Sequence, residues 1–280
     1  MKKIVSFILI FSLVLGLLSG CRGASSDGDV RIGEEGSGNI IIRIGATPVP
    51  HQEILEYIAP FLLEDGIILE IVPFTEYPLV NPAVADGSID ANYFQHRPYL
   101  NAFLENTNND LRIVGDVHVE PLGAYSRRWS NISELPQGAT IAMPNDAPNG
   151  GRSLMLLEYH GLIELNPAEG VLATVEDIIS NPLGLEILTF DAALLPRVLV
   201  DDQADLVIVN TNHLLAGTNF TPRNDSLIIE SLENNPYANM LVTRPELVNH
   251  PAMLTLLRHM QSERVREFIL TNYDGVEPAF

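Results

Sequence analysis

Apolar positions recur along this chain in two rhythms, one typical of strands and one typical of helices. Short, mostly apolar runs predict strands at residues 40–47, 67–74, 89–95, 139–144, 185–190, 204–210 and 238–244, and the run at 40–47 is typical of a buried strand. Apolar side chains spaced three and four positions apart predict helices at residues 51–66, near 82–87, after Arg152 and at 251–273. In the first of these helices Pro60 should cause a kink or a break, and Gly66 should end it. Strands that alternate with helices are typical of parallel α/β sheets.

The predicted elements form two successive sets, and a long extended segment at residues 112–126 lies between them. We therefore expect an α/β protein of two lobes with a ligand cleft between them. One lobe would comprise residues 40–122 together with 236–280, and the other would comprise residues 123–235. A chain of 280 residues is long enough for two such lobes. No internal repeat of about 20–50 residues is visible, which argues against a solenoid.

The first 20 residues differ from the rest and are typical of a secretory signal peptide. Lys2 and Lys3 precede an apolar stretch that is short for a membrane span, and small residues precede Cys21. This ending resembles the lipobox of bacterial lipoproteins, which implies cleavage before Cys21 and attachment of acyl chains such as palmitate to that residue. Two or more acyl chains would anchor a protein stably on a membrane. Residues 21–39 are mostly small and polar, which predicts a flexible, lipidated tether.

Composition narrows the possible functions. Cys21 is the only cysteine, so an internal disulfide is impossible. The net charge is −20, and loss of residues 1–20 would remove two lysines and no acidic residue, which leaves −22. A chain this acidic is a poor partner for nucleic acid or for anionic lipid surfaces. Because no lysine remains after cleavage, Schiff-base enzymes are excluded as well.

The stretch "NDAPNGGR" (145–152) leads from a predicted strand into a helix. Free backbone N–H groups at the start of a helix attract anions, and an arginine can bind a carboxylate through two hydrogen bonds. Arg152 and this helix start therefore suit the α-carboxylate of an amino acid. A surface arginine that pairs with a neighbouring Asp or Glu is the commoner situation, and the pattern alone does not decide between the two.

Two further groups of residues suit the rest of an amino acid. Phe94 and His96 alternate at a strand end and should point to the same side, where aromatic walls would suit a thioether. Phe94 could equally be an ordinary core residue. Asn210 and Asn239 carry amide oxygens that could accept hydrogen bonds from an ammonium group, although a single Asn at a strand end is more often a turn former.

From about residue 40 to residue 280 the chain resembles the methionine-binding lipoproteins of bacterial ABC importers, the NlpA family. The matching motifs are "GATPVPHQEIL" (45–55), "EIVPFTEYPLVNPAVADGSIDANYFQHRPYL" (70–100), "VHVEPLGAYS" (117–126), "ELPQGATIAMPNDAPNGGR" (134–152), "NNPYANMLVTR" (234–244) and "YDGVEPAF" (273–280). The resemblance implies a type II periplasmic-binding-protein fold that closes on an amino acid. By position, it implies ligand contacts from Tyr77, Phe94, His96, Tyr99, Asn149, Arg152, Asn210 and Asn239.

The resemblance also implies a biological setting. The protein would be a monomer on the extracytoplasmic face of the cell membrane, held there by its lipid, and would deliver methionine (L or D) to the permease of an ABC transporter. It would carry out no catalysis and need no cofactor. Two positions depart from the family pattern: His213 stands where an aromatic residue is frequent, and Leu122 where Met is usual. The stereochemistry and the identity of the ligand stay open for that reason.

Two other classes of function remain as alternatives. A zinc-binding receptor would need a metal site, for which the candidates are His51, His96 and His118 with Glu53 or Glu120. Against it, no HxH or HxxxH spacing occurs. An exported hydrolase would need a nucleophile, but Ser153 is not in a G-x-S-x-G turn and no acid–base pair stands out.

Overall fold

The computed structural model describes residues 32–34, 38–167 and 170–280. Residues from Ile32 onward form one unit of the chain. The predicted signal peptide, Cys21 and most of the predicted tether lie outside the described residues. Among the helices in the described ranges, none combines the length and the apolar character that a membrane span requires.

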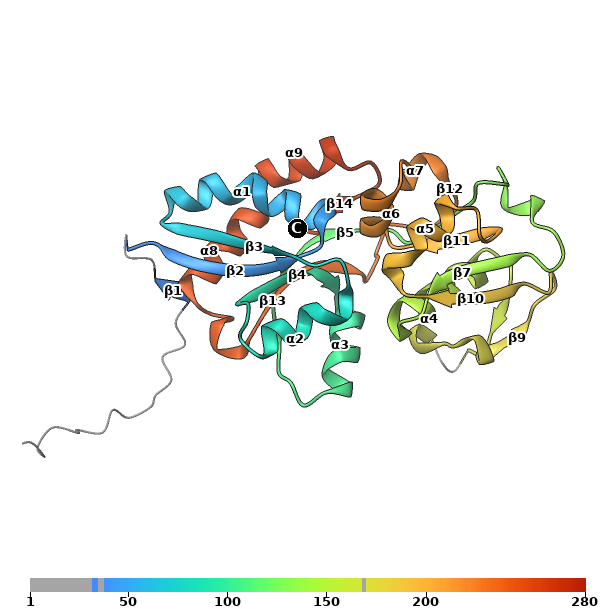
Figure 1. The fold of residues 1–280 in the computed structure, drawn as a ribbon, viewed down its shortest axis with the longest axis horizontal. Helices are drawn as coiled ribbons and strands as arrows, with labels where there is room; N and C mark the ends of the chain where they lie inside the picture. The colour runs from blue at the N-terminus through green and yellow to red at the C-terminus, as the bar shows by residue number, and fades with distance from the viewer. Residues whose placement is uncertain (1–31, 35–37, 168–169) are drawn as a thin grey trace, which may run out of the picture. The chain divides into compact units, whose positions relative to one another are not determined.

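The first sheet has seven strands. In spatial order its main strands are β3 (Ile67–Pro73), β2 (Ile40–Ala46), β4 (Ala91–His96), β13 (Ala238–Thr243) and β5 (Arg112–Val119). Two short strands complete it, β1 (Gly33–Glu34) beside β2 and β14 (Glu277–Pro278) beside β5. β2 runs parallel to β3 and β4, whereas β13 runs antiparallel to β4 and β5. The C-terminal part of the chain thus completes, through β13 and β14, a sheet that the N-terminal part began (Figure 1).

A second sheet is built from the middle of the chain. Its strands, in spatial order, are β10 (Glu186–Phe190), β7 (Thr140–Pro144), β11 (Leu206–Val209), β6 (Gly123–Tyr125) and β12 (Ser226–Ile229). β7 is parallel to β10 and β11, and β6 is antiparallel to β11 and β12. A separate two-stranded ribbon joins β8 (Glu164–Leu165) to β9 (Ile178–Ser180).

Helices cover both faces of the first sheet (Figure 1). The helices of the described residues are α1 (Glu53–Glu64), α2 (Val80–Ala85), α3 (Arg97–Asn106), α4 (Ala147–Tyr159), α5 (Leu195–Val200), α6 (Thr211–Gly217), α7 (Pro222–Asp225), α8 (Pro251–Met260) and α9 (Glu263–Asn272). Leu241 of β13 belongs to the core under α1, α8 and α9, while its neighbours Met240 and Val242 belong to the core under α2 and α3. Alternate residues of a strand point to opposite faces, which explains this division.

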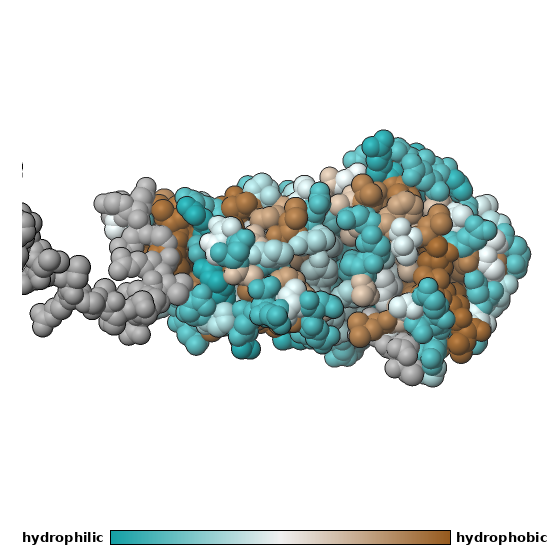
Figure 2. Space-filling model, turned by 60° about the horizontal axis from the view of Figure 1, so that its bottom comes forward, coloured by the Kyte–Doolittle hydropathy of each residue, from teal (hydrophilic) through white to brown (hydrophobic). Residues whose placement is uncertain are grey.

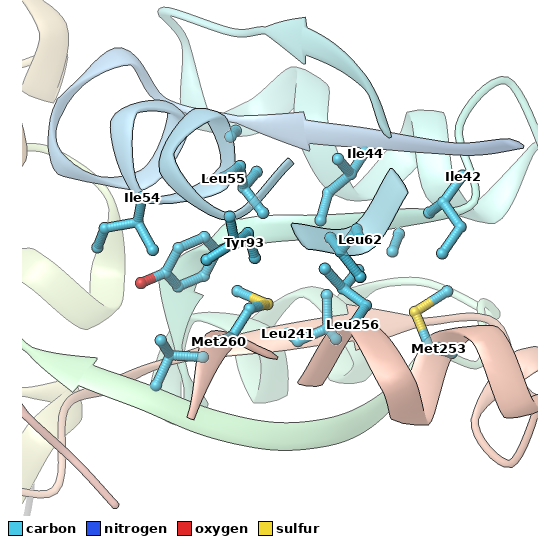
Figure 3. Packing of buried hydrophobic residues seen from close by; sticks show 14 of the residues in the cluster. Ile42, Ile44, Ile54, Leu55, Leu62, Tyr93, Leu241, Met253, Leu256 and Met260 are labelled. Carbon is cyan, nitrogen blue, oxygen red and sulfur yellow. The ribbon is translucent and has the colours of Figure 1, made fainter. Parts of the chain in front are cut away.

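The largest core lies between the first sheet and α1 and α8. Ile44 of β2, Leu62 of α1 and Leu256 of α8 are fully buried there and point toward one another (Figure 3). Each such side chain contributes about 1.5–3 kcal/mol through its removal from water. A second core lies between the second sheet and α4, with Ile141 and Leu154 at its centre. On the face of the molecule that Figure 2 shows, hydrophilic and hydrophobic residues are interspersed.

The observed elements confirm the predicted α/β class and all seven predicted strands, but several features differ from the prediction. The extended segment at 112–126 consists of two strands, β5 and β6, that belong to different sheets. The closing helix is two helices, because Ser262 has an extended backbone and caps the start of α9. Helix α1 continues through Pro60 without a break, and α3 is a helix that the apolar pattern did not predict.

Candidate functional site

One cavity is lined by residues of both sheets and of the helices that follow their strands. All eight residues that the resemblance marked as ligand contacts line it: Tyr77, Phe94, His96, Tyr99, Asn149, Arg152, Asn210 and Asn239. Only about 20 Å³ of the cavity can hold the centre of a water molecule. That is room for about one water. An amino acid can therefore enter only if the lining side chains move apart.

Arg152 lies near the start of α4, and it lines the cavity together with Asn149 of the same helix. Asp146 precedes the first residue of the helix and caps it, because its carboxylate accepts a hydrogen bond from the Asn149 backbone N–H at 3.1 Å. Arg152 is 3% exposed. Its Nε and one terminal nitrogen donate to the Glu230 carboxylate at 2.7 and 2.5 Å, and the same terminal nitrogen donates to the Glu120 carbonyl at 2.8 Å. Its guanidinium carbon lies 3.9 Å from the centre of the Tyr237 ring.

The arginine is therefore already paired with a carboxylate of the protein. Glu230, which follows β12, also accepts a hydrogen bond from the Leu122 N–H at 2.8 Å. Only the second terminal nitrogen of Arg152 is not used in these bonds. The role of Arg152 toward a ligand carboxylate stays a prediction. Sequence reasoning missed Glu230, which lies 78 positions away and in a stretch without any recognisable signal.

Three aromatic rings form one wall of the cavity. The ring centres of Tyr77, Phe94 and Tyr99 are each 5.7 Å from the other two. The Tyr77 hydroxyl donates a hydrogen bond to the Asn212 side-chain oxygen at 2.5 Å. This bond joins two parts of the cavity lining that are 135 positions apart in the sequence. Phe94 and His96 both line the cavity, as their alternation in β4 predicts. His96 Nε2 lies 3.0 Å from the Asn149 side-chain oxygen, and burial lowers the pKa of His96 to about 3.

The opposite wall carries hydrogen-bond acceptors. Glu120 is buried, and burial raises the pKa of its carboxyl. One carboxylate oxygen accepts from His118 Nε2 at 2.7 Å, and the other accepts from the Asn212 backbone N–H at 3.0 Å. Asn210 donates to the Asn149 side-chain oxygen at 2.9 Å, but its own side-chain oxygen has no partner among the described residues. Sequence reasoning considered Glu120 only as a metal ligand, although its place just after β5 is a signal for a cleft residue.

The candidate metal ligands are brought together only in part. His51, His118 and Glu120 offer donor atoms that all lie within 4.8 Å of one another. The other two candidates are engaged elsewhere, since His96 contacts Asn149 and Glu53 accepts a hydrogen bond from the Tyr273 hydroxyl at 2.5 Å. Glu120 thus both lines the cavity and lies close to the imidazole nitrogens of His51 and His118.

Comparisons with known proteins agree with this architecture. A family model described as NlpA lipoprotein matches residues 42–280. The chain is similar to the methionine-binding lipoprotein MetQ of Bacillus subtilis (strain 168), with 36% identity over 98% of this chain and 97% of the relative. It is also similar to the D-methionine-binding lipoprotein MetQ of Escherichia coli (strain K12), with 37% identity over 84% of this chain and 86% of the relative.

Solved structures give the same result. A nutrient-binding protein from Burkholderia cenocepacia, solved bound to methionine, has a TM-score of 0.82 and 36% identity, and the match covers 85% of this chain and 100% of that chain. Together with the two α/β sheets, this similarity confirms the predicted two-lobed periplasmic-binding-protein fold of type II. The relatives' names describe binding proteins and lipoproteins, in agreement with the predicted lipoprotein. The chain therefore belongs to the NlpA lipoprotein family.

Proposed function

We propose that this protein binds methionine on the extracytoplasmic side of the cell membrane and delivers it to an ABC importer. The observation that carries the proposal is a cavity whose lining combines acceptor oxygens with a group of aromatic rings. Two relatives with 36% and 37% identity are named for methionine or D-methionine binding, which supports the same ligand. The proposal leaves the preference for L- or D-methionine to experiment.

Each end of the ligand has a chemically suited partner. The Glu120 carboxylate and the unpartnered oxygen of Asn210 would accept hydrogen bonds from the α-ammonium group. The free terminal nitrogen of Arg152 and the start of α4 would hold the α-carboxylate. Tyr77, Phe94 and Tyr99 would surround the thioether, and sulfur against ring edges adds about 0.3–1.5 kcal/mol per contact.

Binding would use an opening and closing motion of two lobes. We propose that residues 40–122 with 236–280 form one lobe and residues 123–235 the other. The hydrogen bonds Tyr77–Asn212 and His96–Asn149 connect these segments, and they must break before methionine can enter the cavity. Methionine would then replace them with contacts of its own, so its binding favours the closed state.

The setting of the protein follows from the same family membership. We propose a monomer that is anchored through lipid on Cys21 and acts on the extracytoplasmic face of the membrane, with the permease of the importer as its partner. Catalysis forms no part of this function. Ser153, the nucleophile of the hydrolase alternative, donates its hydroxyl hydrogen bond to the Asn149 carbonyl of its own helix at 2.7 Å.

Isothermal titration with L-methionine, D-methionine and alanine tests the proposal. We expect methionine to bind much more tightly than alanine, and Glu120→Gln to weaken methionine because the ammonium loses its buried charged partner. Such a loss typically costs about 2–5 kcal/mol, or roughly 30-fold to several thousand-fold in affinity. The control Glu267→Gln changes an exposed carboxylate on α9 and should bind as the wild type does. Equal affinity for alanine and methionine would refute the proposed ligand.

A further inference from the structure

Behind the acceptor wall of the cavity, two buried imidazoles face the same carboxylate. His118 Nε2 lies 2.7 Å and His51 Nε2 lies 3.5 Å from one Glu120 oxygen. The two imidazole rings have centres 4.9 Å apart. His51 comes from the turn at Pro48–Gln52 that precedes α1, whereas His118 and Glu120 come from the end of β5 and the residue after it. Both histidines are fully buried, and Glu120 is 6% exposed.

The far nitrogen of each ring is held by a hydroxyl group. His51 Nδ1 lies 2.7 Å from the Thr47 hydroxyl, and His118 Nδ1 contacts the Tyr93 hydroxyl. A hydroxyl can donate or accept a hydrogen bond, so each contact can persist whichever ring nitrogen carries the proton. Hydrogen bonds of this kind fix the orientation of metal-binding histidines in proteins. Both Nε2 atoms are thus held toward Glu120 by groups outside the cluster.

Among the described residues, no fixed cation contacts the Glu120 carboxylate directly, although Arg152 favours its charged form at longer range. The hydrogen-bond partners of the Glu120 carboxylate are an imidazole and a backbone N–H, and neither is a fixed cation. Buried carboxylates in proteins are usually paired with a cation or bound to a metal.

We propose that His51 Nε2, His118 Nε2 and the nearer Glu120 oxygen form a binding site for a divalent transition-metal ion, with Zn²⁺ the best match. Two imidazoles and one carboxylate are an established zinc ligand set. Zinc–ligand bonds of about 2.0–2.2 Å in a tetrahedron place neighbouring ligand atoms about 3.3 Å apart. The 3.5 Å separation of His51 and Glu120 already matches this spacing.

Metal binding rearranges the existing hydrogen bonds in a defined way. The ion takes the place of the proton between His118 and Glu120, and these two atoms move apart from 2.7 Å. His51 Nε2 gives up its contact with the Asn239 side-chain oxygen at 3.1 Å. In each ring the proton moves from Nε2 to Nδ1, where the hydroxyl of Thr47 or Tyr93 accepts it. Glu120 also lines the cavity, so a fourth ligand such as a water molecule could reach the ion from that side.

Titration of the chelator-treated full-length protein with Zn²⁺, in the absence of methionine, tests this site. We expect one Zn²⁺ per chain, and a visible absorption spectrum of tetrahedral type when Co²⁺ replaces it. His118→Gln and Glu120→Gln should abolish both signals. Thr47→Val removes only the hydroxyl that holds His51 and should weaken zinc about 10- to 100-fold, the usual effect of such a partner. His160→Ala, which changes an exposed histidine, serves as the control and should bind normally.

Each outcome decides for or against the site. Absence of stoichiometric zinc in the wild type overturns the proposal, and so does zinc binding that survives Glu120→Gln. Repeating the titration in the Cys21→Ala protein shows whether the single thiol supplies the signal, and loss of binding there also overturns it. If His118→Gln does not fold, the Thr47→Val and Glu120→Gln results decide. Methionine titration is a separate measurement, so failure of the metal site leaves the proposed transport function unaffected.

Discussion

Replacement of Arg152 by alanine should destabilise the fold even before any ligand is considered. Arg152 is 3% exposed and donates twice to Glu230, whose side chain is 13% exposed. Arg152→Ala leaves this carboxylate buried with only neutral donors such as the Leu122 N–H. Removal of one partner of a buried ion pair typically costs about 3–5 kcal/mol. Because whole domains are stable by about 5–15 kcal/mol, we expect a folded but clearly weakened protein.

Urea unfolding followed by circular dichroism measures this cost. The midpoint should fall by an amount that corresponds to about 3–5 kcal/mol, with the slope of the transition unchanged. Arg197→Ala is the matched control, because Arg197 is 82% exposed and pairs with Asp201 one helical turn away, an arrangement worth about 0.3–0.5 kcal/mol. The double variant Arg152→Met with Glu230→Leu should recover most of the loss, since no unpaired charge remains. A loss below about 1 kcal/mol in Arg152→Ala would refute the assignment of this pair as a buried one.

Three further predictions concern the anchor, the pH dependence and the ligand side chain. Cys21→Ala should release the protein from membranes into the soluble fraction after cell fractionation; a variant that stays on the membrane would indicate an uncleaved signal anchor instead. The free energy of unfolding should fall as the pH drops from about 6.5 to about 4, by up to about 1.4 kcal/mol per pH unit for each buried histidine, because the unfolded chain binds protons that the folded one excludes. The histidines concerned have pKa values lowered by burial to about 4 or about 3, namely His51, His96, His118 and His213. Urea midpoints at pH 7, 6 and 5 check this, and identical midpoints would contradict it. Phe94→Ala should weaken methionine by roughly 10-fold while alanine binding changes little, since about 1.4 kcal/mol of side-chain contact is lost; titration calorimetry with both amino acids would expose an equal loss, which contradicts a role in side-chain recognition.

Much of this protein is determined by local sequence. The apolar runs at 40–47 and 67–74 appear in the structure as β2 and β3, because short runs rich in isoleucine and other apolar residues favour strands by themselves. Gly66 lies just after the end of α1, as predicted. Its φ of 74° is a backbone conformation that other residues adopt only at a cost in free energy. The family resemblance also marked eight residues that are spread from Tyr77 to Asn239. The structure brings all eight together around one cavity. Their roles toward a ligand stay predictions.

Only the tertiary structure decided which polar groups meet. Glu230 neutralises Arg152 across 78 positions, and His51 approaches Glu120 because the turn before α1 packs against the end of β5. Such contacts depend on the order of the strands in each sheet and on how the segments around the two sheets pack together. No local sequence pattern encodes either of these. The same reason explains why residues 112–126 read as one extended segment: both parts of it are strands, and only their hydrogen-bonding partners place them in different sheets.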